Sequence, residues 1–244
     1  MEMLENSKKI KFIDFCAGIG AGRLGLENLG MQWVGFSEID KKSEITYRAF
    51  FGKDEKNFGD LMKIEPDDLP DFDLMIAGFP CQTFSVIGQR AGMKDDRGQI
   101  IYGLIKIIKT KNLKYFILEN VKGLLNHDGG QTMKIILNEL DKTGYKVFPK
   151  VVSSLNHGVP QMRERIYFVG VRKDLIIKNK AFNFPEEIET PSLKKYLIET
   201  KELEFNEKND SYKTFLRYLN NKYNVGKFSV GELLKEDYLV LDTC

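Results

Sequence analysis

Residues 12–22 read Phe-Ile-Asp-Phe-Cys-Ala-Gly-Ile-Gly-Ala-Gly. An apolar run that passes into a glycine-rich turn predicts a buried strand followed by a loop and a helix. Such glycines let a ligand approach the backbone closely at the start of the helix. Gly20, Gly22 and Gly25 also satisfy the Gly-x-Gly-x-x-Gly pattern, and Glu38 has the spacing of a ribose-binding acid. From these residues alone, a dinucleotide-binding loop and a turn that only packs a helix against a sheet are equally supported.

Strand-like and helix-like segments alternate along most of the chain. The expected strands are 11–16, 33–37, 74–77, 115–118 and 166–171, and the expected helices are 22–29, 41–51, 98–109 and 132–140. This alternation predicts an α/β, doubly wound fold with a mostly parallel sheet that helices cover on both faces. We expect a catalytic domain over residues 1–175 and a partial C-terminal appendage over residues 176–244, where the pattern loosens.

The composition limits the class of protein. Lys plus Arg, 37, nearly balances Asp plus Glu, 35, so a nucleic-acid site has to be a local basic patch. Three widely spaced cysteines, no signal-peptide pattern and no membrane-length apolar run predict a cytoplasmic protein. Two histidines, no Cys-x-x-Cys and no P-loop pattern argue against a metal site, a histidine-centred triad and a P-loop nucleotidase.

Three further motifs carry reactive side chains. Pro80-Cys81-Gln82 and Glu119-Asn120-Val121 each follow an apolar run, and Gln161-Met162-Arg163-Glu164-Arg165 precedes one. Singly, each motif has a simple structural explanation: a turn cysteine, a capping acid and surface ion pairs. Together they bring a thiol, an acid and two arginines to the ends of strands, where α/β sheets bind ligands.

In this order, the motifs resemble those of the cytosine-5 DNA methyltransferases. The matching stretches are 14–22, 38–40, 59–60, 78–85, 97–98, 119–121 and 161–165, so the resemblance covers roughly residues 10–172. It implies the S-adenosylmethionine-dependent methyltransferase variant of the doubly wound sheet. It also implies methyl transfer to C5 of a cytosine flipped out of double-stranded DNA, in a restriction-modification setting.

The resemblance implies a role for each reactive residue. Cytosine C5 is a poor nucleophile, so Cys81 is expected to add to C6 and activate it. Glu119 is expected to act at N3 and Arg165 at O2, while Asn120 and Arg163 hold the geometry of the site. DNA contacts are expected from the glycine-bearing stretch between a strand and a helix, at Gln82, Ser85, Arg90, Lys94 and Arg97.

The resemblance also implies a cofactor site for S-adenosyl-L-methionine. Glu38 is expected to bind the ribose hydroxyls and Asp60 the adenine amino group, with Ile39 packed on the adenine. The other expected cofactor residues are Phe15, Cys16, Gly18, Gly20, Leu61, Pro80 and Ile100. Cys16 and Ile39 stand where the family commonly has aromatic residues, which predicts weak cofactor binding because apolar contact area is lost.

The resemblance weakens towards the C-terminus. In the family, a complete target-recognition region and two more motifs follow the arginine motif, whereas this sequence matches only the early part of that region. The expectation is therefore a second polypeptide that supplies the rest, with truncation as the other explanation. Three alternatives remain at this point: an inactive DNA- or cofactor-binding relative, an RNA (tRNA) cytosine-5 methyltransferase, and an NAD-dependent dehydrogenase.

Overall fold

The computed structural model of the chain describes residues 9–80, 100–177 and 182–196. The chain forms two compact units. The first consists of Met1–Val152 and Glu164–Pro185, and the second of Ser153–Arg163 and Glu186–Cys244.

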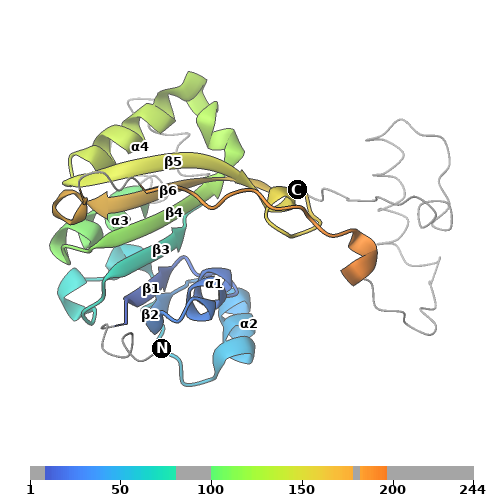
Figure 1. Ribbon diagram of the computed structural model, residues 1–244. Coiled ribbons are helices and arrows are strands. Elements are labelled where there is room, and N and C mark those ends of the chain that lie inside the picture. The colour runs from blue at the N-terminus through green and yellow to red at the C-terminus, as the bar shows by residue number, and fades with distance from the viewer. Residues whose placement is uncertain (1–8, 81–99, 178–181, 197–244) are drawn as a thin grey trace, which may run out of the picture. The chain divides into compact units, whose positions relative to one another are not determined.

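A six-stranded sheet is the framework of the first unit, with the strand order β2-β1-β3-β4-β6-β5 (Figure 1). The strands are β1 Lys11–Phe15, β2 Gln32–Ser37, β3 Leu74–Gly78, β4 Tyr115–Val121, β5 Tyr145–Ser153 and β6 Glu164–Arg172. β1 is parallel to β2 and β3, and β3 is parallel to β4, whereas β6 is antiparallel to β4. The predicted α/β fold is confirmed, with the addition of β5, which the sequence did not predict.

Four α-helices accompany the sheet: α1 Ala21–Asn28, α2 Lys41–Phe51, α3 Ile100–Thr110 and α4 Gln131–Asp141. The capping residues explain the ends of α2. The side chain of Asp40 accepts a hydrogen bond from the Ser43 amide at 3.1 Å, and the helix ends at Gly52, whose φ is 130°. α3 is the most apolar helix, which agrees with its burial.

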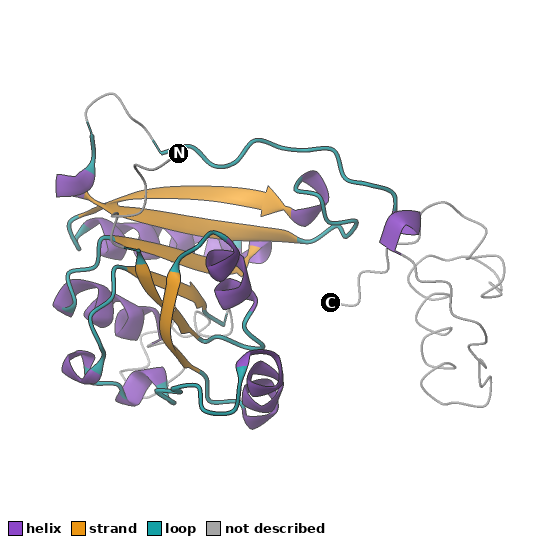
Figure 2. Ribbon diagram, turned by 60° about the horizontal axis from the view of Figure 1, so that its bottom comes forward, coloured by secondary structure: helices purple, strands orange, loops and turns teal. Residues whose placement is uncertain are grey.

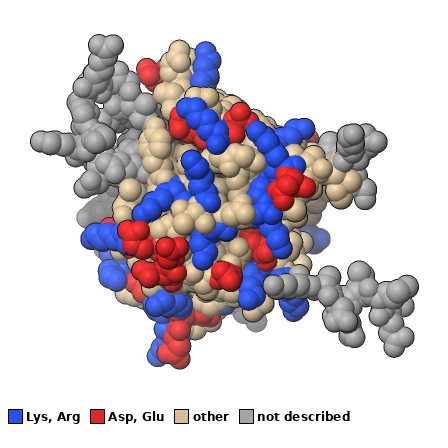
Figure 3. All heavy atoms as spheres, turned by 90° about the vertical axis from the view of Figure 1, so that its left-hand side faces the viewer, with Lys and Arg blue, Asp and Glu red and all other residues tan. Residues whose placement is uncertain are grey.

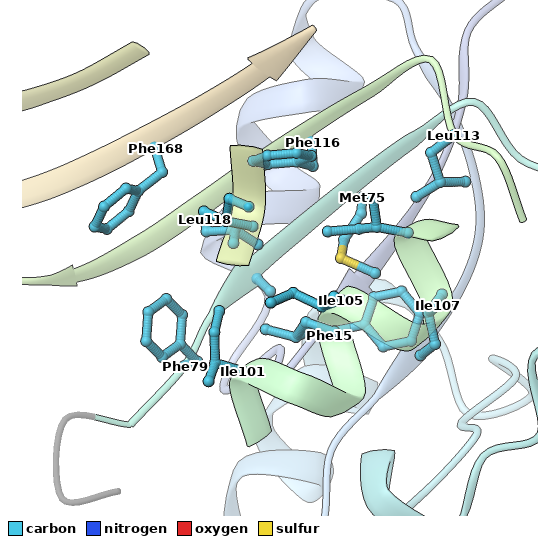
Figure 4. Packing of buried hydrophobic residues seen from close by; sticks show 14 of the residues in the cluster. Phe15, Met75, Phe79, Ile101, Ile105, Ile107, Leu113, Phe116, Leu118 and Phe168 are labelled. Carbon is cyan, nitrogen blue, oxygen red and sulfur yellow. The ribbon is translucent and has the colours of Figure 1, made fainter. Parts of the chain in front are cut away.

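Helices lie on both faces of the sheet (Figure 2). Successive residues of β1 point to opposite faces. Ile13 therefore joins one buried cluster with Leu104 of α3, whereas Phe12 joins another with Leu26 of α1. Figure 4 shows the larger cluster, in which side chains of the strands pack against α3.

The contact between β4 and β6 is unusually close. Gly170 on β6 is the register partner of Phe116 on β4, and Phe116 is completely buried. A Cβ atom at position 170 would lie 2.1 Å from two carbons of the Phe116 ring. Glycine is therefore required here by packing and not by backbone conformation.

In the second unit, the described residues form a short pairing between two segments. His157 and Ile188 form a parallel bridge, and the hydroxyl of Tyr196 donates to the Gly158 carbonyl at 3.0 Å. Residues Leu193–Tyr196, which lie in a segment that the sequence suggested to be helix-prone, form a single 3₁₀ turn.

The surface of the described part carries charges of both signs. On the face seen in Figure 3, lysine and arginine side chains are interspersed with aspartate and glutamate. Within the described ranges, no helix is long and apolar enough to cross a membrane. Nor does any group of three or more potential metal ligands occur among those residues.

Candidate active site

A cavity of about 280 Å³ opens where β1, β2 and β3 end. Small-molecule sites usually measure about 300–1,000 Å³, so this cavity is at the small end of that range. The chain runs from β1 to β2 on one side and returns to β3 on the other, and α/β sheets bind ligands at such a reversal of strand order. The lining residues are Cys16, Ser37, Glu38, Ile39, Asp60, Leu61, Met62, Gly78, Pro80 and Ile100.

Most of the predicted cofactor residues line this cavity, but three do not. Phe15 is completely buried because the alternation of β1 turns it into the core beside α3. Gly18 and Gly20 are also absent from the lining. Sequence reasoning missed three lining residues, Ser37, Met62 and Gly78, which are each adjacent in sequence to a predicted residue or motif.

The two glycines have separate structural roles. Gly18 has a φ of 56°, and its amide donates to Glu38 Oε2 at 2.7 Å. Gly20 has a φ of 94°, and a Cβ atom there would lie 2.3 Å from Cε2 of Phe51 on α2. Gly18 thus holds a cavity residue in place, whereas Gly20 lets the loop pack against α2.

The Glu38 carboxylate is fixed by backbone donors. Besides the Gly18 amide, the amides of Ile39 and Asp40 donate to Oε1 at 2.8 and 2.7 Å. A carboxylate has about four acceptor positions, so this group retains capacity for ligand hydroxyls. Asp60 is a second acceptor in the lining, and its Oδ1 accepts from the Met62 amide at 3.0 Å.

The lining suits an adenosine. Two carboxylates provide acceptors for ribose hydroxyls and for an amino group, as just described. Ile39, Leu61, Met62 and Ile100 provide apolar surface for a purine ring, and Ile39 is 66% exposed. The residues present are therefore compatible with S-adenosylmethionine as the ligand.

Cys16 is not placed to act as a nucleophile. Burial raises the pKa of its thiol to about 12, and the nearby charges of Glu38, Asp14 and Asp60 contribute to the rise. The thiol therefore stays protonated at neutral pH, and only the thiolate is strongly nucleophilic. Its φ of 50° shows that the turn is tight at this residue.

Asp14 is a buried acid beneath this turn. Its Oδ2 accepts from the Arg23 amide at 3.1 Å at the start of α1. Burial raises its pKa from 3.8 to about 8, against the lowering effect of that hydrogen bond, and the charge of Glu38 adds to the rise. The group is thus largely neutral in the folded chain at neutral pH.

Substituting Asp14 with asparagine should change how stability depends on pH. Between pH 4 and pH 8 the folded chain keeps a proton that the unfolded chain releases. The contribution to stability is therefore fully present below about pH 4 and is lost as pH rises through about 8. The asparagine side chain keeps an acceptor for the Arg23 amide but does not titrate, so the Asp14→Asn variant should lack this decline in melting temperature.

Asp174 provides a control of opposite sign. Hydrogen bonds from Arg172 lower the pKa of Asp174, so its contribution is present above about pH 4 and is lost as pH falls. Asp174→Asn should therefore alter only the acidic end of the profile. Parallel melting curves for wild type and Asp14→Asn from pH 4 to 9 would contradict the assignment to Asp14.

A second group of predicted residues lies on β4 and β6, beside the cavity. Glu119 lies within β4, which extends further than the sequence predicted, and Nε of Arg165 lies 2.9 Å from its Oε1. Glu119 is also the register partner of Gly78, which lines the cavity. A Cβ atom at Gly78 would lie 3.3 Å from Glu119 Oε2, so the glycine leaves room for the carboxyl group.

Asn120 connects this group to the segment that leads to Cys81. It is 2% exposed, its Nδ2 donates to the Phe79 carbonyl at 3.0 Å, and its Oδ1 accepts from the Val121 amide at 2.8 Å. Both ends of the amide are therefore satisfied in the core. The contact fixes the path of the chain as it leaves β3.

The remaining predicted residues are not brought into this group by the described structure. Cys81, Gln82, Ser85, Arg90, Lys94 and Arg97 lie outside the described residues. Arg163 is exposed and belongs to the second unit, where its amide donates to the Gln161 carbonyl at 3.0 Å.

Comparisons with known proteins identify relatives of the chain. The family model "C-5 cytosine-specific DNA methylase" matches residues 10–239. The type II methyltransferase M.NgoBI of Neisseria gonorrhoeae is 47% identical over 178 residues, which are 73% of this chain and 54% of the relative. M.HaeII of Haemophilus aegyptius is 47% identical over 181 residues, which are 74% of this chain and 55% of the relative. The chain thus spans about half the length of the curated relatives it matches.

Solved structures support the fold. DNMT2 of Spodoptera frugiperda, as a triple mutant, superposes with a TM-score of 0.64 at 22% identity, covering 80% of this chain and 61% of that one. A prophage-encoded DNA modification methyltransferase described as putative, from Escherichia coli, gives 0.60 at 23% identity, covering 74% and 53%. With the match of the family model over most of its length, the chain belongs to the C-5 cytosine-specific DNA methylase family.

Proposed function

We propose that this chain transfers a methyl group from S-adenosylmethionine to C5 of a cytosine turned out of duplex DNA. One observation carries the proposal: the cavity and the Glu119–Arg165 pair meet at Gly78. The chain continues from Gly78 through Pro80, which also lines the cavity, directly to Cys81. This arrangement supports a single site in which the cofactor cavity, the acid and the thiol serve one reaction.

The chemistry requires covalent activation of the base. In the proposal the Cys81 thiolate adds to cytosine C6, and the electrons of the C5–C6 double bond become available at C5. S-adenosylmethionine supplies an electrophilic methyl group when bound. Glu119 hydrogen-bonds to N3 and so stabilises the adduct, while Arg165 orients the Glu119 carboxyl group and contacts O2. Loss of the C5 proton to a base then expels the thiolate and restores the double bond.

The target base has to leave the duplex because stacked bases shield C6 from the thiolate. The contact from Asn120 to the Phe79 carbonyl supports a fixed starting point for the segment that carries Cys81. We propose that Gln82, Ser85, Arg90 and Arg97 in the following stretch contact the DNA. Phosphate contacts of this kind make binding dependent on salt concentration.

The proposal is tested by the transfer of labelled methyl groups from S-adenosylmethionine to duplex DNA, with tRNA as an alternative substrate. Label at cytosine C5 of DNA supports it, whereas label on tRNA alone identifies an RNA methyltransferase. DNA binding without transfer identifies an inactive relative. The predicted second polypeptide remains a prediction, and the same assay tests it when a candidate complementary chain is added.

The substitution Glu38→Ala should weaken binding of S-adenosylhomocysteine by about 10- to 100-fold, because hydrogen bonds to a charged acceptor contribute roughly 1.5–3 kcal/mol. Isothermal titration calorimetry measures this directly. Glu139→Ala is the matched control, since Glu139 pairs with Lys142 on α4 and does not line the cavity. Equal affinity of the Glu38→Ala variant and wild type would remove Glu38 from the cofactor site.

A further inference from the structure

Asn57 connects the two segments that carry the acidic residues of the cavity. Its Nδ2 donates to the Glu38 carbonyl at 3.0 Å, and its Oδ1 accepts from the Glu38 amide at 3.1 Å. The same Oδ1 accepts from the Gly59 amide at 2.8 Å. Asn57 thus holds the backbone of Glu38 on both sides and also fixes the residue that precedes Asp60.

A fourth contact gives the Asn57 side chain a defined orientation. Asn57 hydrogen-bonds to Glu44 in the first turn of α2, and this bond, after those from Arg48 and Lys41, helps to lower the pKa of Glu44 to about 2. Two amide donors thus face two acceptors, and the single oxygen faces two backbone amides. The hydrogen-bonding capacity of the side chain is used in full.

The surrounding backbone follows the same path. The Phe58 amide donates to the Phe36 carbonyl at 2.7 Å, and Ser37 Oγ donates to the Gly59 carbonyl at 2.6 Å. These contacts dock the segment against the end of β2. The Asn57 side chain is the one group among these that reaches Glu38 itself.

We propose that Asn57 is a positioning residue of the cofactor site, which sets the separation between the Glu38 and Asp60 carboxylates. This inference rests on the proposed binding of S-adenosylmethionine. Binding groups are effective when neighbouring residues hold them in place before the ligand arrives. Asn57 does not line the cavity, so its effect on the ligand has to pass through Glu38 and Asp60.

The test is a double-mutant cycle measured with S-adenosylhomocysteine on the full chain. Asn57→Ala should weaken binding about tenfold, but in the Glu38→Ala background the further loss should be less than about twofold. The loss should also shrink for the 2′-deoxyribose analogue, which lacks one of the hydroxyls that Glu38 is proposed to bind. Asn138→Ala, an exposed change on α4, is the matched control and should leave affinity unchanged.

Asn57→Asp provides a second variant if the alanine variant does not fold. Aspartate keeps the acceptor for the Glu38 and Gly59 amides but loses the donor to the Glu38 carbonyl, so the same non-additive loss is expected. Additive losses in the cycle, or equal losses for both ligands, would overturn the positioning role while leaving the proposed function intact. A wild-type chain that does not bind S-adenosylhomocysteine would overturn both.

Discussion

Replacing Cys81 with serine is expected to lower methyl transfer by roughly a thousandfold or more, and to abolish the covalent adduct with DNA. A serine hydroxyl is almost entirely protonated at neutral pH, so it adds to C6 far more slowly than a thiolate does. The measurement is a denaturing gel of the chain with a 5-fluorocytosine duplex and S-adenosylmethionine, under conditions where the wild-type chain transfers methyl groups. Fluorine at C5 cannot leave as a proton does, so the adduct persists.

The other two cysteines give matched controls for the same change of atom. Cys244→Ser should leave the adduct unchanged. Cys16→Ser alters the lining of the cavity, so it should change cofactor affinity but still permit the adduct. An adduct of undiminished yield in Cys81→Ser would show that another residue is the nucleophile.

The substitution Gly170→Ala is expected to destabilise the chain by about 3 kcal/mol, the upper end of the usual cost of overpacking a core. The added methyl group meets the ring of Phe116, which is completely buried and packs on Tyr145 with a ring-centroid distance of 5.3 Å. The ring has little space into which to move. Thermal unfolding should show a melting temperature lower by roughly 6–12 °C.

Two comparisons identify the cause of that loss. Gly25→Ala adds the same methyl group at an exposed helical position with no atom within 4 Å, and it should stabilise the chain by roughly 0.5–1 kcal/mol. Phe116→Leu combined with Gly170→Ala should be less destabilising than the sum of the single changes, because the smaller side chain makes room. A Gly170→Ala variant as stable as wild type would contradict the packing argument.

The sequence predicted the parallel part of the sheet because each of those strands is a short, strongly apolar run. β5 was missed for physical reasons. Its residues 145–153 include Pro149 and two exposed lysines, which interrupt an alternating pattern. An edge strand tolerates both, because proline needs no ladder partner there and lysine discourages pairing with other chains.

The candidate site was predictable where a motif supplies the side chain, as with Glu38, Asp60 and Glu119. It was not predictable where the contribution depends on how distant segments meet. Gly78 matters because β3 lies beside Glu119, a relation that the sequence does not contain. Asn57 has a local sequence signal, since asparagine often hydrogen-bonds nearby backbone in turns, but its partner Glu38 lies far away in the chain.

The antiparallel insertion of β6 next to β4 has a consequence for synthesis on the ribosome. Strands β1 to β4 emerge in order and pair with one another, but the edge of β4 stays open until β6 has been made. During that interval the nascent chain exposes unpaired backbone groups that favour aggregation. Arg165 arrives with the strand that closes this edge, so Glu119 gains its ion-pair partner only in the last step of sheet assembly.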